Sequence, residues 1–410
     1  MPDAITMPAV RHPFARALPT LSPEVLGGAL QAAVGRARSR PFPLGAPGAR
    51  WLFLGRNAVY RGLRALGLGA GELVLMPALH HGVEVEAALA AGVRVEFYPV
   101  DLSLQPDLDA VRRRMRSAGA RVLYAIHFIG YPQPLVEMQA IAREAGAYLI
   151  EDCALALFSA TSEGVPLGSV GDASIFSLYK TLPIPDGGVL WLAQGRDSLP
   201  EPRRPPWGST IAEAGSSAIS HAFTSGHERL AELLWAAVRR VRRHVDLRRS
   251  LGEAATGTNH LDPACLDLGI SPFSRWLASG LDEAAACRIV ERRRRNFERM
   301  AQALGDPALL ALPAPLPVGT CPLFFPLLAR DGAQKDHLLC ALERAGIGAI
   351  NFWRIAHPAL VPADFPEATE LRERIVEVPI HQDLDEEAVE QIVRVLKGAL
   401  AASRRQRSIA

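Results

Sequence analysis

Between residues 72 and 178, short apolar segments alternate with amphipathic ones, and this alternation constrains the fold more than any other feature of the chain. The segments expected to be strands are 72–77, 93–100, 121–128, 147–153 and 174–178. The segments expected to be helices are 80–92, 106–119 and 134–146. Strands and helices that alternate at this spacing form a mainly parallel sheet with helices on both faces. We therefore expect an α/β fold whose ligand site lies at the carboxyl ends of the strands.

A chain of 410 residues is long enough for a large α/β domain and a smaller second domain. Residues 1–50 are rich in Pro, Ala and Arg, and we expect them to form an arm that packs on the body of the protein or on a partner subunit. The large domain is expected over 51–255, and an interdomain helix with a small α+β domain over 256–410. The pattern there predicts strands at 321–329, 347–353 and 376–379, helices at 281–304, 336–346 and 385–400, and a disordered tail at 403–410.

Composition excludes several classes of protein. The net charge of +2 gives no support for a general nucleic-acid binder. The five cysteines are odd in number and show no C-x-x-C spacing, which argues for a reducing compartment and against a disulfide framework or structural zinc. We see neither the apolar core of a signal peptide nor an apolar run of about 18 residues, and so expect a cytoplasmic protein without a membrane span.

One lysine stands out, because only three of the 45 Lys and Arg residues are lysines. Lys335 and Lys397 fall in polar helical segments, where a solvated position is expected. Lys180 instead follows an apolar strand and has no acidic neighbour before Asp186. A lysine amine can lose its proton and form an imine, whereas an arginine cannot. The alternative is a lysine at a strand end that points into water.

Asp152 ends another apolar strand and is expected at the rim of a buried cleft. An unpaired carboxylate is costly to ionise there, so it needs a cationic partner, and a protonated pyridine nitrogen would serve. The alternative is an Asp that caps the next helix. Glu151 points to the opposite face of the strand, where a structural role is expected.

Further polar residues lie at the ends of the other strands. His81 could stack on a planar ring or cap the helix that begins near Gly82. His127 fits a buried core position better than a ligand position. Ser177 could donate to a phosphate or to the local backbone.

The segment 55–71 is expected to be a helix that Asn57 caps. The start of a helix after a strand offers free N–H groups and the positive end of the helix dipole, which suit a phosphate. Many helices start in this way without binding an anion, and that alternative stays open.

Taken together, these segments resemble fold-type-I pyridoxal-phosphate enzymes, and among them the DegT/DnrJ/StrS sugar aminotransferase family. The resemblance extends from about Gly55 to Leu396. It rests on the order and spacing of GRNAVYRGLRALGLGAGELVLMP, VLYAIHFIGYP, YLIEDCALAL, GDASIFSLYKTLPIPDGG and VPIHQDLDEEAVEQIV. It implies that the cofactor is pyridoxal 5′-phosphate and that the sites are shared in a homodimer, with Arg275 near the partner subunit's site.

The resemblance also implies a role for each site residue. Lys180 matches the lysine that forms the Schiff base with the cofactor, and Asp152 matches the acid that pairs with the pyridine nitrogen. His81 falls where the family places an aromatic side chain over the ring. The positions implied to bind the phosphate are Arg56, Asn57 and Ser177.

Some positions depart from the family pattern. Leu155 stands where the family often has Gln, Arg56 replaces a phosphate-binding Thr, and the spacing from Ser177 to Lys180 differs by two residues. These changes are compatible with the cofactor chemistry, but they leave open whether the substrate is a nucleotide-linked sugar. Some members carry His in place of the lysine and dehydrate sugars, and Lys180 argues against that branch.

The implied function is transfer of an amino group from an amino acid, with glutamate expected as donor, to a keto-sugar or related ketone in a biosynthetic pathway. One alternative is a lyase or other carbanion chemistry with the same cofactor on an unusual substrate, which Leu155 and Arg56 motivate. Another is a member that binds the cofactor without catalysis, against which the pair of Lys180 and Asp152 argues.

Arginines crowd the second half of a helix expected over 227–250. A solvated face with a basic end that complements the helix dipole is the simpler interpretation. The functional alternatives are docking to an anionic membrane surface or to a phosphorylated substrate carrier.

Overall fold

The computed structural model describes residues 15–34, 39–193, 199–225, 261–310 and 315–409, together with 227, 229, 232 and 233. Most of the basic helix expected over 227–250 lies outside these residues, so its role stays a prediction. Among the described helices, none is both long and apolar enough to span a lipid bilayer.

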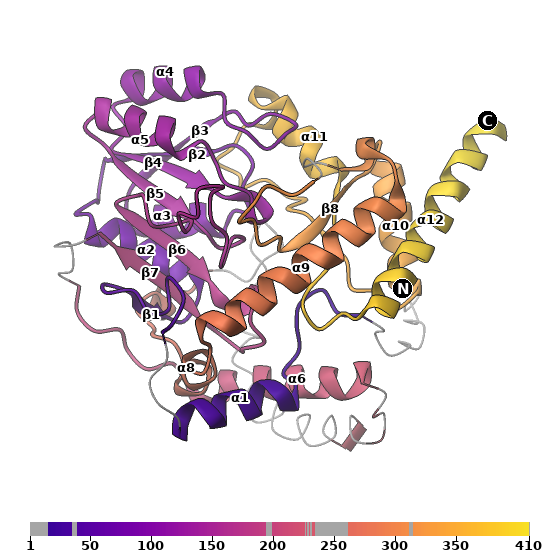
Figure 1. The fold of residues 1–410 in the computed structure, drawn as a ribbon. Coiled ribbons are helices and arrows are strands. Elements are labelled where there is room, and N and C mark those ends of the chain that lie inside the picture. The colour runs from indigo at the N-terminus through magenta and orange to yellow at the C-terminus, as the bar shows by residue number, and fades with distance from the viewer. Residues whose placement is uncertain are drawn as a thin grey trace, which may run out of the picture.

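In the described part of the chain, the larger sheet has seven strands in the order β1-β7-β6-β5-β4-β2-β3 (Figure 1). The strands are β1 (Arg50–Leu52), β2 (Leu73–Pro77), β3 (Arg94–Tyr98), β4 (Val122–Ile126), β5 (Tyr148–Asp152), β6 (Ala173–Ser177) and β7 (Gly188–Leu192). The five from β2 to β6 are parallel, and β7 pairs antiparallel with both β6 and β1. The predicted α/β fold with a mainly parallel sheet is therefore confirmed.

Helices cover both faces of this sheet. They are α2 (Gly55–Ala65), α3 (Val83–Ala90), α4 (Leu108–Ala118) and α5 (Leu135–Glu144). α2 packs on α3, and α4 packs on α5, so the two pairs lie on opposite faces, as right-handed crossovers require. With both faces covered, β2, β4 and β6 are buried along their whole length, which is why they read as continuous apolar runs.

The predicted elements occur with small changes at their ends. α4 begins after Asp107, whose side chain accepts the N–H of Ala110 at 2.9 Å, and it ends at Gly119 in the left-handed conformation. The helix predicted from residue 80 begins only at Val83, because the backbone of Gly82 has a φ of 110° and cannot continue a helix backwards.

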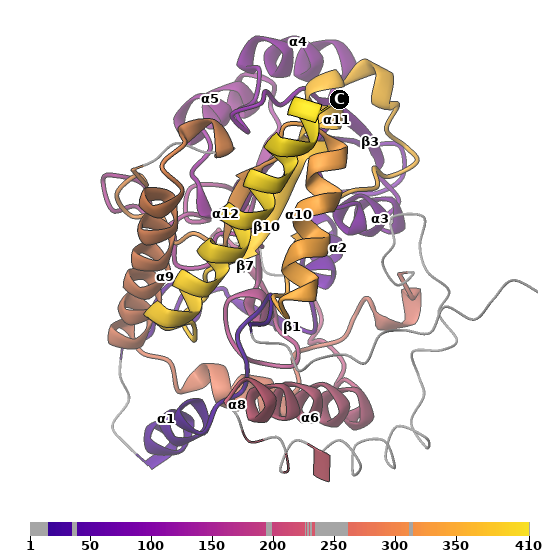
Figure 2. The same cartoon turned by 90° about the vertical axis from the view of Figure 1, so that its right-hand side faces the viewer.

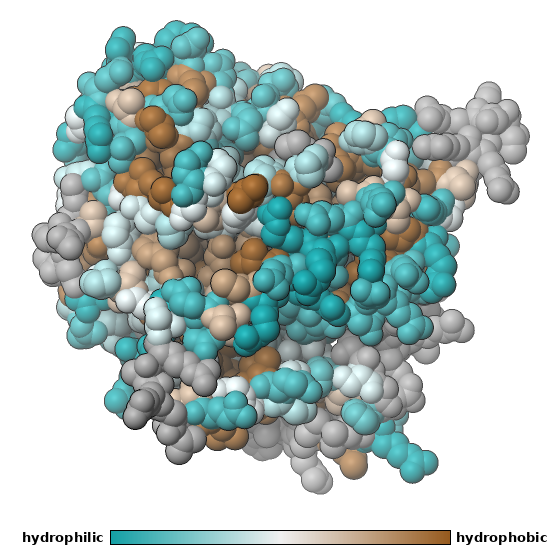
Figure 3. Space-filling model, in the orientation of Figure 1, coloured by the Kyte–Doolittle hydropathy of each residue, from teal (hydrophilic) through white to brown (hydrophobic). Residues whose placement is uncertain are grey.

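The C-terminal part contains a second sheet, which has three antiparallel strands among the described residues in the order β8-β10-β9. These are β8 (Phe324–Leu328), β9 (Ile350–Asn351) and β10 (Ile375–Pro379), with helices α10 (Gly332–Arg344), α11 (Pro366–Arg374) and α12 (Glu386–Ile409). The long helix α9 (Glu283–Leu304) packs against α12, and α12 packs against α10 (Figure 2). Hydrophilic residues gather over α9 on the outer surface (Figure 3).

Three expectations for this part were wrong. The strand predicted over 347–353 shortens to β9, because Trp353 has a φ of 39° and turns the chain away. The tail expected to be disordered continues α12 as far as Ile409. Lys335, expected in solvent, is only 2% exposed, and its Nζ donates to the carbonyl of Arg372 at 2.6 Å.

The described part of the N-terminal arm packs on the body of the same chain. α1 (Pro23–Val34) contacts α8 (Pro272–Ser279) and lies beside α6 (Trp207–Thr224). Ala15 forms an isolated bridge with Ile347 near the small sheet. The division of the chain at 50 and 255 itself stays a prediction.

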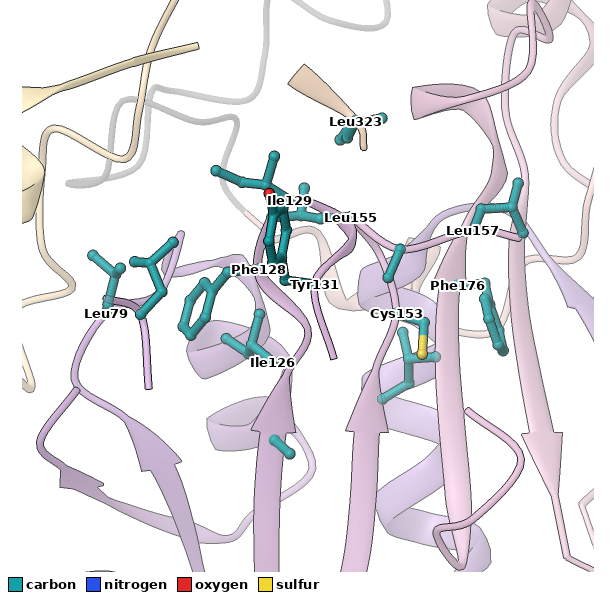
Figure 4. Packing of buried hydrophobic residues seen from close by; sticks show 14 of the residues in the cluster. Leu79, Ile126, Phe128, Ile129, Tyr131, Cys153, Leu155, Leu157, Phe176 and Leu323 are labelled. Atoms are coloured by element: carbon teal, nitrogen blue, oxygen red, sulfur yellow. The ribbon is translucent and has the colours of Figure 1, made fainter. Parts of the chain in front are cut away.

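Apolar side chains fill the space beyond the carboxyl ends of β4 and β5 (Figure 4). Ile126, Phe128 and Leu155 are buried there, and Leu323 from the C-terminal part faces them. The N–H of Leu323 donates to the carbonyl of Ile129 at 3.2 Å. The C-terminal part therefore packs against the edge of the large sheet at which the carboxyl ends of β4 and β5 lie.

Candidate active site

The residues expected at the site converge on one cavity at the carboxyl edge of the large sheet. Those that line it are Arg56, His81, Asp152, Ser177 and Lys180. Asp152 and Ser177 end β5 and β6, and the others follow β1, β2 and β6 in the chain. Because these strands run in one direction, their carboxyl ends meet at the same edge, which is where such sheets bind ligands.

Lys180 lies in a short 3-10 turn, Leu178–Lys180, directly after β6. The N–H of Leu178 donates to the carbonyl of Gly187 at 2.8 Å, and the N–H of Gly187 donates to the carbonyl of Phe53 at 2.7 Å. Phe53 precedes α2, so these bonds hold the turn with the lysine close to the start of that helix.

Asp152 is buried and oriented by two hydrogen bonds. The hydroxyl of Tyr124 donates to Oδ2 at 2.6 Å, and the N–H of Ala154 donates to Oδ1 at 2.8 Å. Burial raises the pKa of Asp152, while these bonds and the charge of Lys180 act in the opposite direction. In the described stretch 153–159 no helix begins, so a helix cap does not explain this carboxyl group.

His81 also faces the cavity, and its Nδ1 is buried without a hydrogen-bond partner in the described structure. Burial, with the positive charges of Lys180, Arg56 and Arg372, lowers the pKa of His81 to about 3, so the ring is neutral at physiological pH. Its ring stands nearly perpendicular to that of Trp353, with centroids 6.2 Å apart.

Glu84 is a cavity residue that the sequence analysis missed. Its carboxylate accepts the N–H of His81 at 2.8 Å and the N–H of Gly82 at 3.1 Å, and so it fixes the loop that carries His81. Burial and the neighbouring Asp152 raise the pKa of Glu84. The sequence signal for this role was an acidic residue just after Gly82, where the helix starts. Acidic residues are common in the first turn of a helix, so Glu84 did not stand out.

Asn57 takes a different place from the one expected. Its Oδ1 accepts the N–H of Leu54 at 3.1 Å, and its Nδ2 donates to the carbonyls of Cys265 and Leu266 at 2.6 and 2.9 Å. The side chain is buried and lies outside the cavity lining. Asn57 therefore fastens the segment around residue 265 to α2, and it is not available to bind a phosphate with its side chain.

His127 and Glu151 are structural, as their strand faces suggested. Nδ1 of His127 accepts the N–H of Gln133, and its Nε2 lies 3.1 Å from Glu151. Glu151 also accepts backbone N–H groups from the turn at 168–171. Cys153 lies close enough for the three to form a metal-ligand set, but the nitrogen and oxygen atoms already have hydrogen-bond partners, so the geometry does not favour a metal ion here.

Two more residues shape the cavity. Leu155 lines it where the family often has Gln, so the predicted departure lies at the site itself. Trp353 reaches the cavity from the C-terminal part and stacks on Phe352 with centroids 4.2 Å apart. Sequence reasoning read Trp353 as a strand residue. Arg275, expected near a partner's site, lies over the ring of Trp51 at 5.8 Å, and its role toward a partner stays a prediction.

The model of the DegT/DnrJ/EryC1/StrS aminotransferase family matches residues 55–196, the stretch that contains all the site residues expected from the sequence. Over residues 55–196 the chain is therefore similar to this aminotransferase family. The predicted resemblance is thereby confirmed for the part of the chain that forms most of the cavity.

Curated relatives each align with about a third of the chain. GDP-perosamine synthase of Vibrio cholerae is 30% identical over 139 residues, which cover 33% of this chain and 37% of that protein. A dTDP-4-dehydro-2,3,6-trideoxy-D-glucose 4-aminotransferase of Saccharopolyspora spinosa is 33% identical over 142 residues, 34% and 36% of the two chains. Serine hydroxymethyltransferase of Pyrococcus furiosus is 30% identical over 134 residues, which cover 30% of this chain and 31% of that protein. The alignments thus span about a third of the length of these relatives.

Solved structures match the chain over nearly its whole length. The aminotransferase TlmJ from Streptoalloteichus hindustanus superposes with a TM-score of 0.63 at 24% identity, covering 97% of this chain and all of that one. The protein Spr1654 from Streptococcus pneumoniae superposes with a TM-score of 0.65 at 14% identity, covering 96% of this chain and 100% of that one. These likenesses confirm the fold expected from the resemblance, a large sheet domain followed by a smaller C-terminal part.

Proposed function

We propose that this chain is a pyridoxal 5′-phosphate-dependent aminotransferase that moves an amino group from an amino acid to a keto-sugar or related ketone in a biosynthetic pathway. The observation that carries the proposal is the convergence of Lys180, Asp152 and Ser177 on one cavity at the carboxyl edge of the sheet. These residues supply an amine, a buried carboxylate and a hydroxyl, which suit the aldehyde, the ring nitrogen and the phosphate of that cofactor.

The cavity has further features that fit the cofactor. Asp152 is a buried carboxylate, which requires a cationic partner when it is ionised. His81 has a buried ring nitrogen, Nδ1, that has no hydrogen-bond partner in the described structure. At the start of α2, a Cβ at Gly55 would lie only 3.3 Å from Oγ of Ser177. Glycine therefore keeps room between the helix start and the hydroxyl, in the place where an anion would be bound by free N–H groups.

We assign the binding roles accordingly. Arg56, Ser177 and the first N–H groups of α2 would hold the phosphate, and Asp152 would pair with the ring nitrogen. His81 would lie against the ring, and Lys180 would bind the aldehyde carbon covalently. Asn57, assigned to the phosphate by resemblance, would act only by shaping the helix start.

The protein's part in the reaction follows from these roles. When bound, the cofactor supplies an electron sink that accepts the electron pair left after loss of the substrate's α-proton. Asp152, fixed by Tyr124 and Ala154, keeps the ring nitrogen protonated. Once the amine of the substrate has displaced Lys180 from the aldehyde carbon, the freed amine of Lys180 would take the α-proton as general base and pass it on, as general acid, to a different carbon. Leu155 and Trp353 line the cavity that holds that amine.

The names of the relatives support a sugar-like ketone as acceptor, since two of those reported act on nucleotide-linked hexoses by name. Others are named as L-glutamine:scyllo-inosose and L-glutamine:2-deoxy-scyllo-inosose aminotransferases, whose acceptor names carry no nucleotide. We expect glutamate to be the amino donor, and glutamine is the second candidate because two relatives are named for it. We also propose that the protein is a homodimer with shared sites, which rests on the family resemblance. We further propose that it is cytoplasmic, because all five cysteines, each in the described part of the chain, are free.

The test begins with purified protein and pyridoxal 5′-phosphate. Borohydride reduction followed by peptide mass spectrometry should find the cofactor on Lys180, and Lys180→Ala should carry none. Addition of glutamate or glutamine should convert the bound cofactor to pyridoxamine 5′-phosphate, and a panel of keto-sugars and inososes should convert it back. Release of product without accumulation of the pyridoxamine form would point to a lyase. Bound cofactor that no donor alters would point to a non-catalytic protein.

A further inference from the structure

The strongest unassigned feature near the cavity is the guanidinium of Arg372. Arg372 lies near the end of α11 and is only 4% exposed. Its Nη1 donates to the carbonyls of His80 and Trp353, at 2.8 and 2.7 Å, and its Nη2 donates to the carbonyl of Ala78 at 3.0 Å. Every bond described for this side chain therefore ends on main-chain oxygen.

These carbonyls belong to two separate segments that line the cavity. Ala78 and His80 lie in the loop after β2, which leads directly into His81. Trp353 is far away in the sequence and lies in the turn just after β9, a strand of the second sheet. One side chain thus fastens the His81 loop of the large sheet to the Trp353 turn of the small one. The rings of His81 and Trp353 meet where these two segments meet.

The Trp353 turn needs such a restraint. Its φ of 39° is a conformation that bulky residues rarely adopt, and it persists only where the surroundings hold it. Arg is suited to this task, because its planar fork can donate to several carbonyls at fixed angles, which the single ammonium of Lys cannot do.

The anchor of Arg372 is itself held in place. The ammonium of the buried Lys335, on α10, donates to the carbonyl of Arg372 at 2.6 Å. On the other side, the carboxylate of Glu84 balances part of the guanidinium charge and binds the N–H of His81. The arrangement extends from α10 through Arg372 to the loop that carries His81.

We propose that Arg372 is a positioning residue: it sets the separation and orientation of His81 and Trp353, the two ring-bearing walls of the cavity that come from different sheets. It touches neither substrate nor cofactor in this role. The proposal rests on these contacts and does not require the proposed function to be correct.

Hydrogen exchange tests the proposal without any ligand. In Arg372→Lys and Arg372→Gln, peptides covering 78–84 and 350–354 should exchange at least roughly tenfold faster, while those covering β8 keep their wild-type rates. Arg374→Lys is the matched control, because Arg374 lies on the same helix and also donates to a carbonyl, that of Ala329, away from the cavity. Wild-type rates at 78–84 and 350–354, or equal acceleration throughout the small sheet region, would overturn the positioning role.

Should the Arg372 variants fail to fold, the wild-type chain decides the matter. Across a series of low denaturant concentrations, 78–84 and 350–354 should open together with one free energy, because one guanidinium holds both. Separate opening of the two segments would refute the proposal.

Binding of pyridoxal 5′-phosphate adds a readout of the cavity itself. Arg372→Lys should raise the dissociation constant at least roughly tenfold, and Arg374→Lys less than twofold. Trp353→Leu should weaken binding too, and the double variant should bind no worse than the weaker single variant, since one acts through the other. Additive losses would contradict this. If the wild-type protein does not bind this cofactor, the proposed function fails, whereas the exchange measurements still test Arg372.

Discussion

Asp152 and Glu84 place two carboxyl groups in one small cavity, and their surroundings separate their tasks. Glu84 uses its oxygens on the N–H groups of His81 and Gly82 and serves to hold a loop. Asp152 receives one hydroxyl and one N–H and faces the charge of Lys180. Only Asp152 is therefore arranged to meet a ring cation.

We expect Asp152→Asn to impair turnover far more than folding. The amide can keep the bond from Ala154 and a bond with Tyr124, but it cannot balance a ring cation. Turnover should fall by roughly 100-fold or more, while the melting temperature should stay within a few degrees or rise, because a buried charge is removed. Steady-state kinetics and thermal unfolding measure the two effects. Near-normal turnover would remove Asp152 from the proposed mechanism.

His80 predicts a measurable pH dependence of stability. The side chain is fully buried and stacks on Phe97, and burial lowers its pKa to about 3. The unfolded chain, with an ordinary pKa near 6.5, binds more protons between these values, so stability is lost as the pH falls below about 6.5. His80→Asn should reduce the loss between pH 7 and pH 5 by about 2 kcal/mol in urea unfolding, at about 1.4 kcal/mol per pH unit. An unchanged pH profile would show that His80 does not titrate in this way.

At the scale of elements, β7 and the start of α2 pack closely against each other beside the site. A Cβ at Gly188, the first residue of β7, would lie 2.3 Å from the carbonyl oxygen of Leu54, just before α2. This contact brings the β6–β7 connection, with Lys180, against the start of the helix. Any side chain at position 188 would push the two elements apart.

Gly188→Ala should therefore lower the free energy of unfolding by about 1–3 kcal/mol and weaken binding of pyridoxal 5′-phosphate. Gly398→Ala in α12 is the control, because a Cβ there meets open space. That substitution should be neutral or stabilise the protein by about 0.5–1 kcal/mol. Urea unfolding and a cofactor titration compare the two variants, and equal behaviour would mean that the close approach is not required.

For the whole molecule, the decisive connection is Arg293 on α9, which is only 1% exposed. It donates to Gln382, to the carbonyl of Leu323 and to that of Thr181, which directly follows Lys180. The turn that carries Lys180 and the small sheet region are thus joined through one buried side chain of the long helix.

Arg293→Met should destabilise the chain by about 3 kcal/mol or more, because several buried acceptors lose their donor. Arg295→Met on the same helix should change stability by no more than about 0.5 kcal/mol, since Arg295 is largely exposed and forms only a surface pair with Glu291 at 3.8 Å. Chemical unfolding measures both, and a small effect at Arg293 would show that other contacts join the two regions.

Local patterns were sufficient for much of the molecule. Apolar runs and their spacing predicted the parallel sheet and its helices, and the strand ends predicted that Lys180, Asp152 and His81 would meet. Arg56 and Ser177 were assigned to the site by the family resemblance, and all five residues line one cavity. A strand that is buried on both faces must be apolar along its length, and strands that run in one direction bring their ends to the same edge of the sheet. The sheet and the position of its strand ends could therefore be predicted from the sequence. Asn57 shows the limit: its side chain looked free for an anion until residues 265 and 266 were folded against it.

The sequence by itself determined the α/β class, the edge at which a ligand binds and the amine and acid that face it, because periodicity and strand order act over short distances. Only the tertiary structure decided that Lys335 is buried, that Trp353 turns into the cavity and that Arg372 joins it to the His81 loop. Those outcomes depend on hydrogen bonds to main-chain carbonyl groups far away in the chain. Every residue has such a carbonyl, so the sequence does not indicate which one a side chain will bind.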